Sequence, residues 1–142
     1  MLRVNYLLAL KDKDVWTISP DAPVIDAVRL MAERGIGALP VVQGSELVGI
    51  VSERDYARKV ILRGRSSAET PVRDIMSTPV ETISPDQAVH NCMQTMTDKR
   101  IRHLPVVDRG RLIGMISIGD LVKAVIEEQQ QTIAQLERYI AS

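Results

Sequence analysis

Apolar residues recur at positions i, i+3, i+4 and i+7 in two stretches of the chain, residues 24–31 and 89–96. This spacing places apolar side chains on one face of a helix, so each stretch predicts an amphipathic helix that packs against a core. The two apolar stripes consist of Val24, Ala27, Val28 and Met31 in the first stretch and of Val89, Cys92, Met93 and Met96 in the second.

The first of these helices has a predicted start and a predicted end. Ser19 is a residue type that caps helices, Pro20 suits the first helical position, and Asp21 suits the first turn. Glycine commonly terminates helices, so we expect this helix to run from Pro20 to about Arg34 and to end at Gly35.

Two apolar runs follow each helix and predict a β-hairpin. The stretch "IGALPVVQGSELVGIVS" covers residues 36–52 with "QGSE" as its turn, and "IRHLPVVDRGRLIGMIS" covers residues 101–117 with "DRGR" as its turn. We expect a further helix after each hairpin, over residues 53–64 and 118–140. With a short extended piece before the first helix, each half reads β-α-β-β-α.

The two halves are copies of one unit. Residues 17–56 align without gaps on residues 82–121, and 16 of the 40 aligned pairs are identical, where chance would give roughly two or three. Two such units packed sheet against sheet predict an α+β fold with pseudo-twofold symmetry and equivalent clefts between the halves. The expected divisions are a first repeat with the N-terminal segment at 1–63, a connector at 64–81, a second repeat at 82–126 and a C-terminal helix extension at 127–142.

Composition narrows the class of protein. The 142 residues are 45% hydrophobic with no phenylalanine, so the core is expected to be aliphatic, and a net charge of zero argues against a nucleic-acid or membrane-surface partner. The single cysteine, Cys92, cannot form an internal disulfide, and the chain has no run of 18 apolar residues. We therefore expect a cytoplasmic protein that does not enter a membrane.

A Ser-x-x-Asp motif closes the hairpin of each repeat, at Ser52–Asp55 and Ser117–Asp120. At a strand-to-helix junction this motif predicts a capping box, in which serine and acid each bind a main-chain N–H of the other. The same junction suits a nucleotide, because a helix start attracts phosphate and a carboxylate can accept hydrogen bonds from ribose hydroxyls. The two interpretations are compatible.

These motifs together resemble the CBS domain, two copies of which form a Bateman module. The resemblance is carried by "TISPD" at 17–21 and 82–86, by "LPVV" at 39–42 and 104–107, by the two Ser-x-x-Asp motifs and by "VRDIM" at 72–76, and it covers residues 7 to 126. It implies a regulatory module that binds AMP, ADP, ATP, NAD(H) or S-adenosylmethionine without catalysing a reaction.

The resemblance also implies a set of ligand-binding residues. The aspartates of the motif, Asp55 and Asp120, would hold the ribose, and we expect Gly37-Ala38 to work with Asp120 and Arg102-His103 with Asp55. The second arrangement is richer in positive charge, which suggests a preference for the more phosphorylated ligand. The full expected set is Thr17, Ile18, Gly37, Ala38, Pro40, Ser52, Arg54, Asp55, Thr82, Ile83, Arg102, His103, Pro105, Ser117 and Asp120.

Other classes of function receive less support from the residues. Two histidines, one cysteine and no paired carboxylates leave little for acid–base or nucleophilic chemistry, and no metal-ligand spacing is present. We expect no catalytic cofactor, no metal and no enzyme activity. The alternative to a nucleotide sensor is a protein-interaction scaffold in which both motifs serve only as helix caps.

The C-terminal helix shows heptad spacing. Ile126, Ile133 and Ile140 fall at one core position, and the other is held by Val122, Gln129 and Leu136. Fewer than three full heptads is short for an independent coiled coil, so we expect this helix to pack against "YLLAL" at 6–10 or across a dimer interface. The family resemblance likewise favours a homodimer, and the target protein is unknown.

Overall fold

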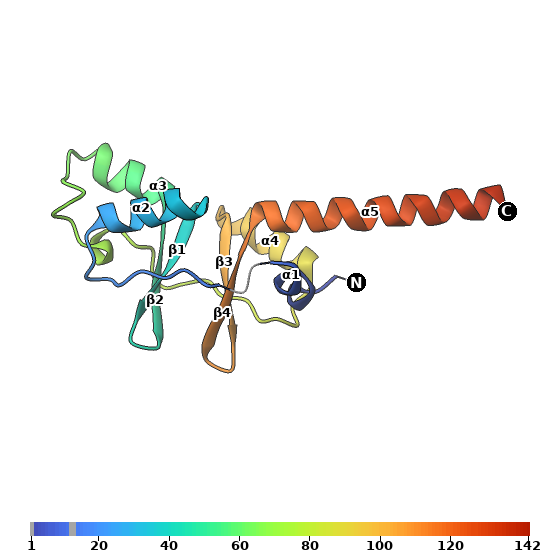
Figure 1. Ribbon diagram of the computed structural model, residues 1–142, viewed down its shortest axis with the longest axis horizontal. Helices are drawn as coiled ribbons and strands as arrows, with labels where there is room; N and C mark the ends of the chain where they lie inside the picture. The colour runs from blue at the N-terminus through green and yellow to red at the C-terminus, as the bar shows by residue number, and fades with distance from the viewer. Residues whose placement is uncertain (1, 12–13) are drawn as a thin grey trace.

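The computed structural model describes residues 2–11 and 14–142, and it has an α+β architecture built from two similar halves. Each half contains a two-stranded antiparallel sheet, and the two hairpins stand side by side with their turns at the same end (Figure 1). The helices are α1 (Val4–Leu10), α2 (Val24–Arg34), α3 (Glu53–Tyr56), α4 (Val89–Lys99) and α5 (Ile118–Ala141), and the strands are β1 (Ala38–Gln43), β2 (Glu46–Ser52), β3 (His103–Asp108) and β4 (Arg111–Ser117).

The predicted hairpins are confirmed. In both sheets the strands pair in the same register, with a bulge between Val41 and Val42 in the first and between Val106 and Val107 in the second. The predicted extended piece is reduced to one bridging residue in each half, Ile18 or Ile83, which lies parallel to the first strand of its hairpin.

The predicted start of α2 is wrong. The segment from Ser19 forms a turn, in which the Ala22 N–H donates to the Ser19 carbonyl and the Asp21 N–H donates to the Ser19 Oγ, both at 3.2 Å. Pro23 is then extended, with φ −66° and ψ 145°, so the helix begins only at Val24. The predicted end is confirmed, because Gly35 adopts the left-handed conformation at φ 64°.

The helices after the hairpins begin as the motifs predict. Ser52 and Ser117 each accept a hydrogen bond from the main-chain N–H of the aspartate three residues later, and the aspartate accepts one from the serine N–H. Both motifs are therefore capping boxes. In the first half the α-helix is short and continues as a π-helical turn, Ala57–Ile61, whereas in the second half it extends over 24 residues as α5.

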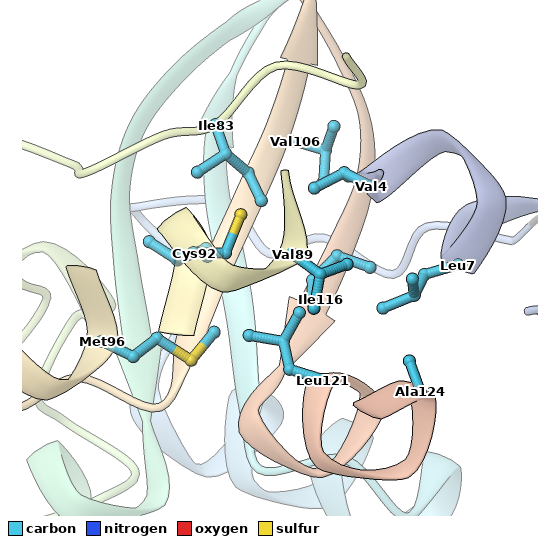
Figure 2. Close-up of a cluster of buried hydrophobic side chains, with 11 residues drawn as sticks. Val4, Leu7, Ile83, Val89, Cys92, Met96, Val106, Ile116, Leu121 and Ala124 are labelled. Carbon is cyan, nitrogen blue, oxygen red and sulfur yellow. The ribbon is translucent and has the colours of Figure 1, made fainter. Parts of the chain in front are cut away.

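The structure contains two separate hydrophobic cores, one for each repeat. Residues of α2, β1 and β2 form the first core, to which Val72 and Ile75 of the expected connector contribute fully buried side chains. Residues of α4, β3, β4 and α5 form the second core, to which the N-terminal Val4 and Leu7 contribute. In Figure 2, Val4 and Leu7 of α1 face the side chains of Val89, Ile116 and Leu121.

The N-terminal segment packs on the second repeat and hydrogen-bonds to it in the same way as residues 70–76 do on the first repeat. Val72 N–H donates to the Ala22 carbonyl and Val24 N–H to the Thr70 carbonyl; Val4 N–H donates to the Gln87 carbonyl and Val89 N–H to the Leu2 carbonyl. Residues 22 and 24 correspond to 87 and 89 in the repeat, so the two arrangements are equivalent. The segment that precedes the first repeat in sequence therefore completes the second repeat in space.

The equivalence extends to a close side-chain contact over a glycine. A Cβ added to Gly49 would lie 2.5 Å from the Met76 sulfur, and a Cβ added to Gly114, its counterpart, would lie 2.5 Å from the Leu8 Cδ2. A side chain at either position would displace the segment that covers the sheet, so glycine is required there by space.

We expect Leu7→Ala to destabilise the protein by about 2–5 kcal/mol, because Leu7 is 4% exposed in the second core and its truncation leaves a cavity. Urea denaturation measures the change, and hydrogen exchange should show that β3, β4 and α4 lose protection first. The matched control is Leu10→Ala in the same helix, where the side chain is 65% exposed and the change should stay within about 0.5 kcal/mol. Equal effects of the two substitutions would contradict the assignment of α1 to the second core.

Candidate functional site

A cavity of about 1080 Å³ lies where the two repeats and the N-terminal segment meet. Its walls come from the end of α2 and the start of β1 in the first repeat, and from β3, β4 and the start of α5 in the second. Six of the expected ligand-binding residues line it, namely Gly37, Ala38, Pro40, His103, Ser117 and Asp120.

Asp120 is held in place by the capping box of α5. Its Oδ2 accepts a hydrogen bond from the Ser117 N–H at 2.9 Å, and its own N–H donates to the Ser117 Oγ at 3.2 Å. The Ile118 N–H donates to the Arg102 carbonyl at 2.8 Å. Two of the first N–H groups of α5 are therefore already used, so this helix start offers a phosphate fewer donors than the sequence suggested.

Lys11 joins Asp120 from the N-terminal segment. Its Nζ lies 2.7 Å from the Asp120 Oδ2 and donates a second hydrogen bond to the Met115 carbonyl at 2.7 Å. Burial by itself raises the pKa of Asp120, but the bonds from Lys11 and Ser117 outweigh burial and hold the pKa below its usual value. The carboxylate is therefore ionised at neutral pH.

At Gly37 and Ala38 the first repeat contributes main chain and one small side chain to the cavity that Asp120 lines. Gly37 lies against the imidazole of His103, since a Cβ added to Gly37 would come 3.3 Å from the His103 Cε1. Burial, followed by the positive charge of Lys11, lowers the pKa of His103, so the ring is neutral at pH 7. A neutral imidazole has one nitrogen that donates and one that accepts a hydrogen bond, so this wall of the cavity suits a polar group of a bound molecule.

Sequence reasoning missed Trp16, Arg34 and Lys11, which also line the cavity. The Arg34 guanidinium carbon lies 3.7 Å from the centroid of the Trp16 ring, which is a cation–π contact. Lys11 could have been found by aligning the apolar residues of "VNYLL" at 4–8 with those of "VRDIM" at 72–76, since both segments cover a sheet. The one tryptophan of the chain gave no comparable pattern.

Asp55, the counterpart of Asp120, sits in a more closed environment. Its Oδ2 accepts from the Ser52 N–H at 2.9 Å and from the Ser52 hydroxyl at 3.0 Å, while its Oδ1 lies 3.1 Å from the Lys59 Nζ. The Asp55 side chain is 12% exposed and that of Asp120 is 27% exposed. Both aspartates are thus paired with a lysine, but only Asp120 lines the large cavity.

The remaining expected residues lie elsewhere in the described part of the chain. Arg54 donates to the Arg100 carbonyl at 3.5 Å, and Arg102 is exposed, its carbonyl accepting the bond from α5. Ile83 is buried in the second core, and Thr82 lines a separate groove beside the hairpin turns. Thr17 is exposed, Ile18 bridges to β1, Ser52 caps α3, and Pro105 accepts a hydrogen bond from Ile83.

The structure supports the expected pairing of Gly37-Ala38 with Asp120 but not that of Arg102-His103 with Asp55. Gly37 and Ala38 share the cavity with Asp120, as the expected pairing requires. His103, expected beside Asp55, lines this same cavity, whereas Asp55 and Arg102 are not among the described residues that line it. The idea of a second, more positively charged site stays a prediction.

Two further findings concern metal binding and membrane-spanning helices. Within residues 2–11 and 14–142, no group of three or more His, Cys, Asp or Glu side chains is placed to hold a metal ion. Over the same residues, no helix combines the length and the apolar character needed to cross a membrane.

Comparison with known proteins identifies the repeats. The family described as "CBS domain" matches residues 9–62 and 72–127. The chain is 46% identical over 131 residues to the mitochondrial CBS domain-containing protein CBSX3 of Arabidopsis thaliana, covering 89% of this chain and 63% of that protein. The chain therefore spans less than two thirds of that relative.

Solved structures agree with the sequence comparison. A CBS-domain protein of Burkholderia ambifaria is 51% identical and superposes with a TM-score of 0.87, covering 90% of this chain and 96% of that one. The CBS domain pair of protein MJ0100, determined with 5′-methylthioadenosine and S-adenosyl-L-methionine, is 23% identical with a TM-score of 0.80, covering 90% of this chain and 98% of that one.

The duplicated unit, the paired hairpins and capping boxes, and both family matches lead to one conclusion: this chain belongs to the CBS-domain family and consists of two tandem CBS domains.

Proposed function

We propose that the chain is a regulatory module that binds an adenosine-containing ligand in the cavity at Asp120. The observation that carries this proposal is that an ionised carboxylate of the second repeat and the Gly37-Ala38 segment of the first repeat line one cavity of about 1080 Å³. A carboxylate accepts hydrogen bonds from ribose hydroxyls, and main-chain groups recognise the edge of a base.

The hydrogen bonds of Asp120 leave it able to take a ligand. The bonds from Ser117 and Lys11 both reach Oδ2, whereas a carboxylate can accept about four hydrogen bonds over its two oxygens. The capping box fixes the direction of the carboxylate before a ligand arrives, which lowers the entropy cost of binding. Helix capping and ligand binding are therefore compatible roles for the same residue.

The cavity lining carries both signs of charge, with Asp14 and Glu33 as acidic residues besides Asp120, so an anionic group beyond the ribose would lie beside Lys11 or Arg34. Lys11 and Arg34 line the cavity as cations, and Lys11 already lies beside the ribose-binding position that we assign to Asp120. A cation next to the ribose is well placed for a phosphate attached to it. AMP, ATP and NAD(H) meet this requirement, as does S-adenosylmethionine through its carboxylate.

Relatives in the family support an adenosyl ligand and a regulatory role. The distantly related CBS pair of MJ0100 was solved with two adenosine-containing molecules, and we extend that ligand class to this chain.

The side chains around the cavity support binding rather than catalysis. Asp120 is paired with Lys11, and the single cysteine, Cys92, is buried in the second core with a raised pKa because burial disfavours its thiolate.

We expect Asp120→Asn to weaken binding of the preferred ligand by about 10- to 100-fold, because a hydrogen bond to a charged group contributes about 1.5–3 kcal/mol. Isothermal titration calorimetry of the full chain with AMP, ATP, NAD⁺, S-adenosylmethionine and 5′-methylthioadenosine measures the effect. Asn keeps the carbonyl oxygen that accepts the Ser117 N–H, so the helix cap is preserved.

Asp55→Asn is the matched control for this substitution, because it makes the same change in the equivalent capping box away from the cavity. It should change the affinity of the cavity at Asp120 by less than about threefold. Equal losses from the two substitutions would contradict the choice of cavity, and no binding of any compound by the unmodified chain would favour the scaffold alternative.

We expect the preference for AMP over adenosine to increase as the pH falls below about 6.5, through protonation of His103. Burial and Lys11 lower the pKa of His103, so the ring is neutral at pH 7 and gains its positive charge only at lower pH. That charge attracts phosphate and has little effect on the uncharged nucleoside.

The AMP phosphate itself loses charge near pH 6, which works in the opposite direction, so the comparison must be made against His103→Gln. The ratio of AMP to adenosine affinity should rise more, or fall less, in the unmodified chain than in the variant between pH 7 and 5.5. Identical pH profiles in the two proteins would mean that His103 does not face the phosphate.

A further inference from the structure

The far half of α5 presents a stripe of large apolar side chains to solvent. Ile133 is 54% exposed, Leu136 is 56% exposed and Ile140 is 81% exposed, and Ile126 and Val122 continue the stripe toward the body of the protein. In Figure 1, α5 extends away from both repeats, beyond every other labelled element. A surface of this kind, in a row on one helix, marks an interaction site.

The stripe is distinct from the face that packs α5 on its own repeat. Leu121 and Ala124, near the start of the helix, are the buried residues of α5 and contact the second core. On an ideal helix, with about 100° per residue, the centre of the stripe lies more than a third of a turn away from them. The expected packing against residues 6–10 therefore involves the first turns of α5, where α1 contacts it, and leaves the stripe exposed.

The stripe has the spacing of a coiled-coil seam. Its residues alternate between steps of four and three, so that the three isoleucines occupy the a positions and the remaining residues occupy the d positions. The far half of α5 is also short for a helix without a packing partner, since isolated helices of fewer than about 12–15 residues are marginal in water. The residues that form the stripe are Val122, Ile126, Gln129, Ile133, Leu136 and Ile140.

We propose that this stripe binds the same stripe of a second copy of the chain, with the two α5 helices antiparallel. In an antiparallel pair each a position faces a d position of the partner helix. With the twofold axis near residue 131, Ile126 meets Leu136 of the second copy and Ile140 meets Val122, so large apolar residues are matched along the seam.

Charge complementarity is what selects a second copy in this orientation. Lys123 and Glu137 both occupy e positions, which flank the seam, and the antiparallel register places each beside the other residue of the second copy. Within one helix these two residues are 14 positions apart, or roughly 21 Å, too far to form an ion pair. The dimer therefore gains two ion pairs that a single chain cannot make.

A parallel pair would lack these ion pairs. Equivalent residues would then face one another, so Lys123 would stay roughly 21 Å from the partner's Glu137. Both pairs of repeats would also be brought to the same end of the seam, whereas the antiparallel pair places them at opposite ends. Gln129 lies in the seam next to Ile133 of the second copy. A single polar residue at a core position commonly lowers the stability of a coiled coil, so Gln129 lowers the stability of this dimer.

The first test is the oligomeric state of the full chain, measured by sedimentation equilibrium over a concentration series. The unmodified chain should dimerise, and Ile133→Glu should raise the dissociation constant at least tenfold by placing a charge in the seam. Gln131→Glu is the matched control, because it introduces the same residue on the opposite face of the same helical turn and should leave the constant within about twofold. A monomeric unmodified chain, or a dimer unaffected by Ile133→Glu, would overturn the proposal.

The second test addresses the orientation through a charge exchange. Lys123→Glu and Glu137→Lys should each weaken the dimer, because each places like charges side by side across the seam. The double variant restores opposite charges in the antiparallel pair and should recover the affinity of the unmodified chain within about twofold. Additive weakening in the double variant would rule out the antiparallel arrangement, since the two residues then do not meet.

Discussion

The packing of one covering segment over each hairpin is the contact on which the arrangement of this protein depends. Met76 lies over Gly49 and Leu8 lies over Gly114, in both cases so closely that a Cβ could not be added. Each segment also contributes two buried residues to the core beneath it. A half of about 60 residues has little core of its own, so a repeat without its covering segment would be marginal.

The covering segments come from different places in the chain, and this makes the two halves unequal. Residues 70–76 cover the first repeat, whereas the N-terminal residues cross over to the second. The crossing brings Lys11 to Asp120, while Asp55 is paired with Lys59 of its own helix. The sequence is duplicated, but the two aspartates therefore meet different surroundings, and only one of them lines the large cavity.

Local signals predicted most of the fold, and long-range contacts account for what they missed. The apolar stripes, the hairpin turns and the Ser-x-x-Asp caps depend on residues close in sequence, and each was confirmed. The start of α2 was misplaced because Pro23, rather than Pro20, marks where the chain turns into the helix. Lys11 was missed because its role depends on the crossing of the N-terminal segment to the second repeat, which is indicated only when residues 4–8 are compared with residues 72–76. Trp16 was missed because a single aromatic residue forms no pattern in the sequence.

The cavity and the exposed stripe are connected by a single continuous helix. Asp120 is the third residue of α5 and lines the cavity, and Ile140 lies at the far end of the same 24-residue helix. A helix of this length is stiff, so a small tilt in its first turn becomes a displacement of several Å at its end. If Asp120 binds the ligand as proposed, a ligand that replaces or reorients Lys11 would act on that first turn, where the cap fixes the direction of the helix. Under the two proposals, ligand occupancy and the geometry of the seam would therefore be linked through the direction of α5.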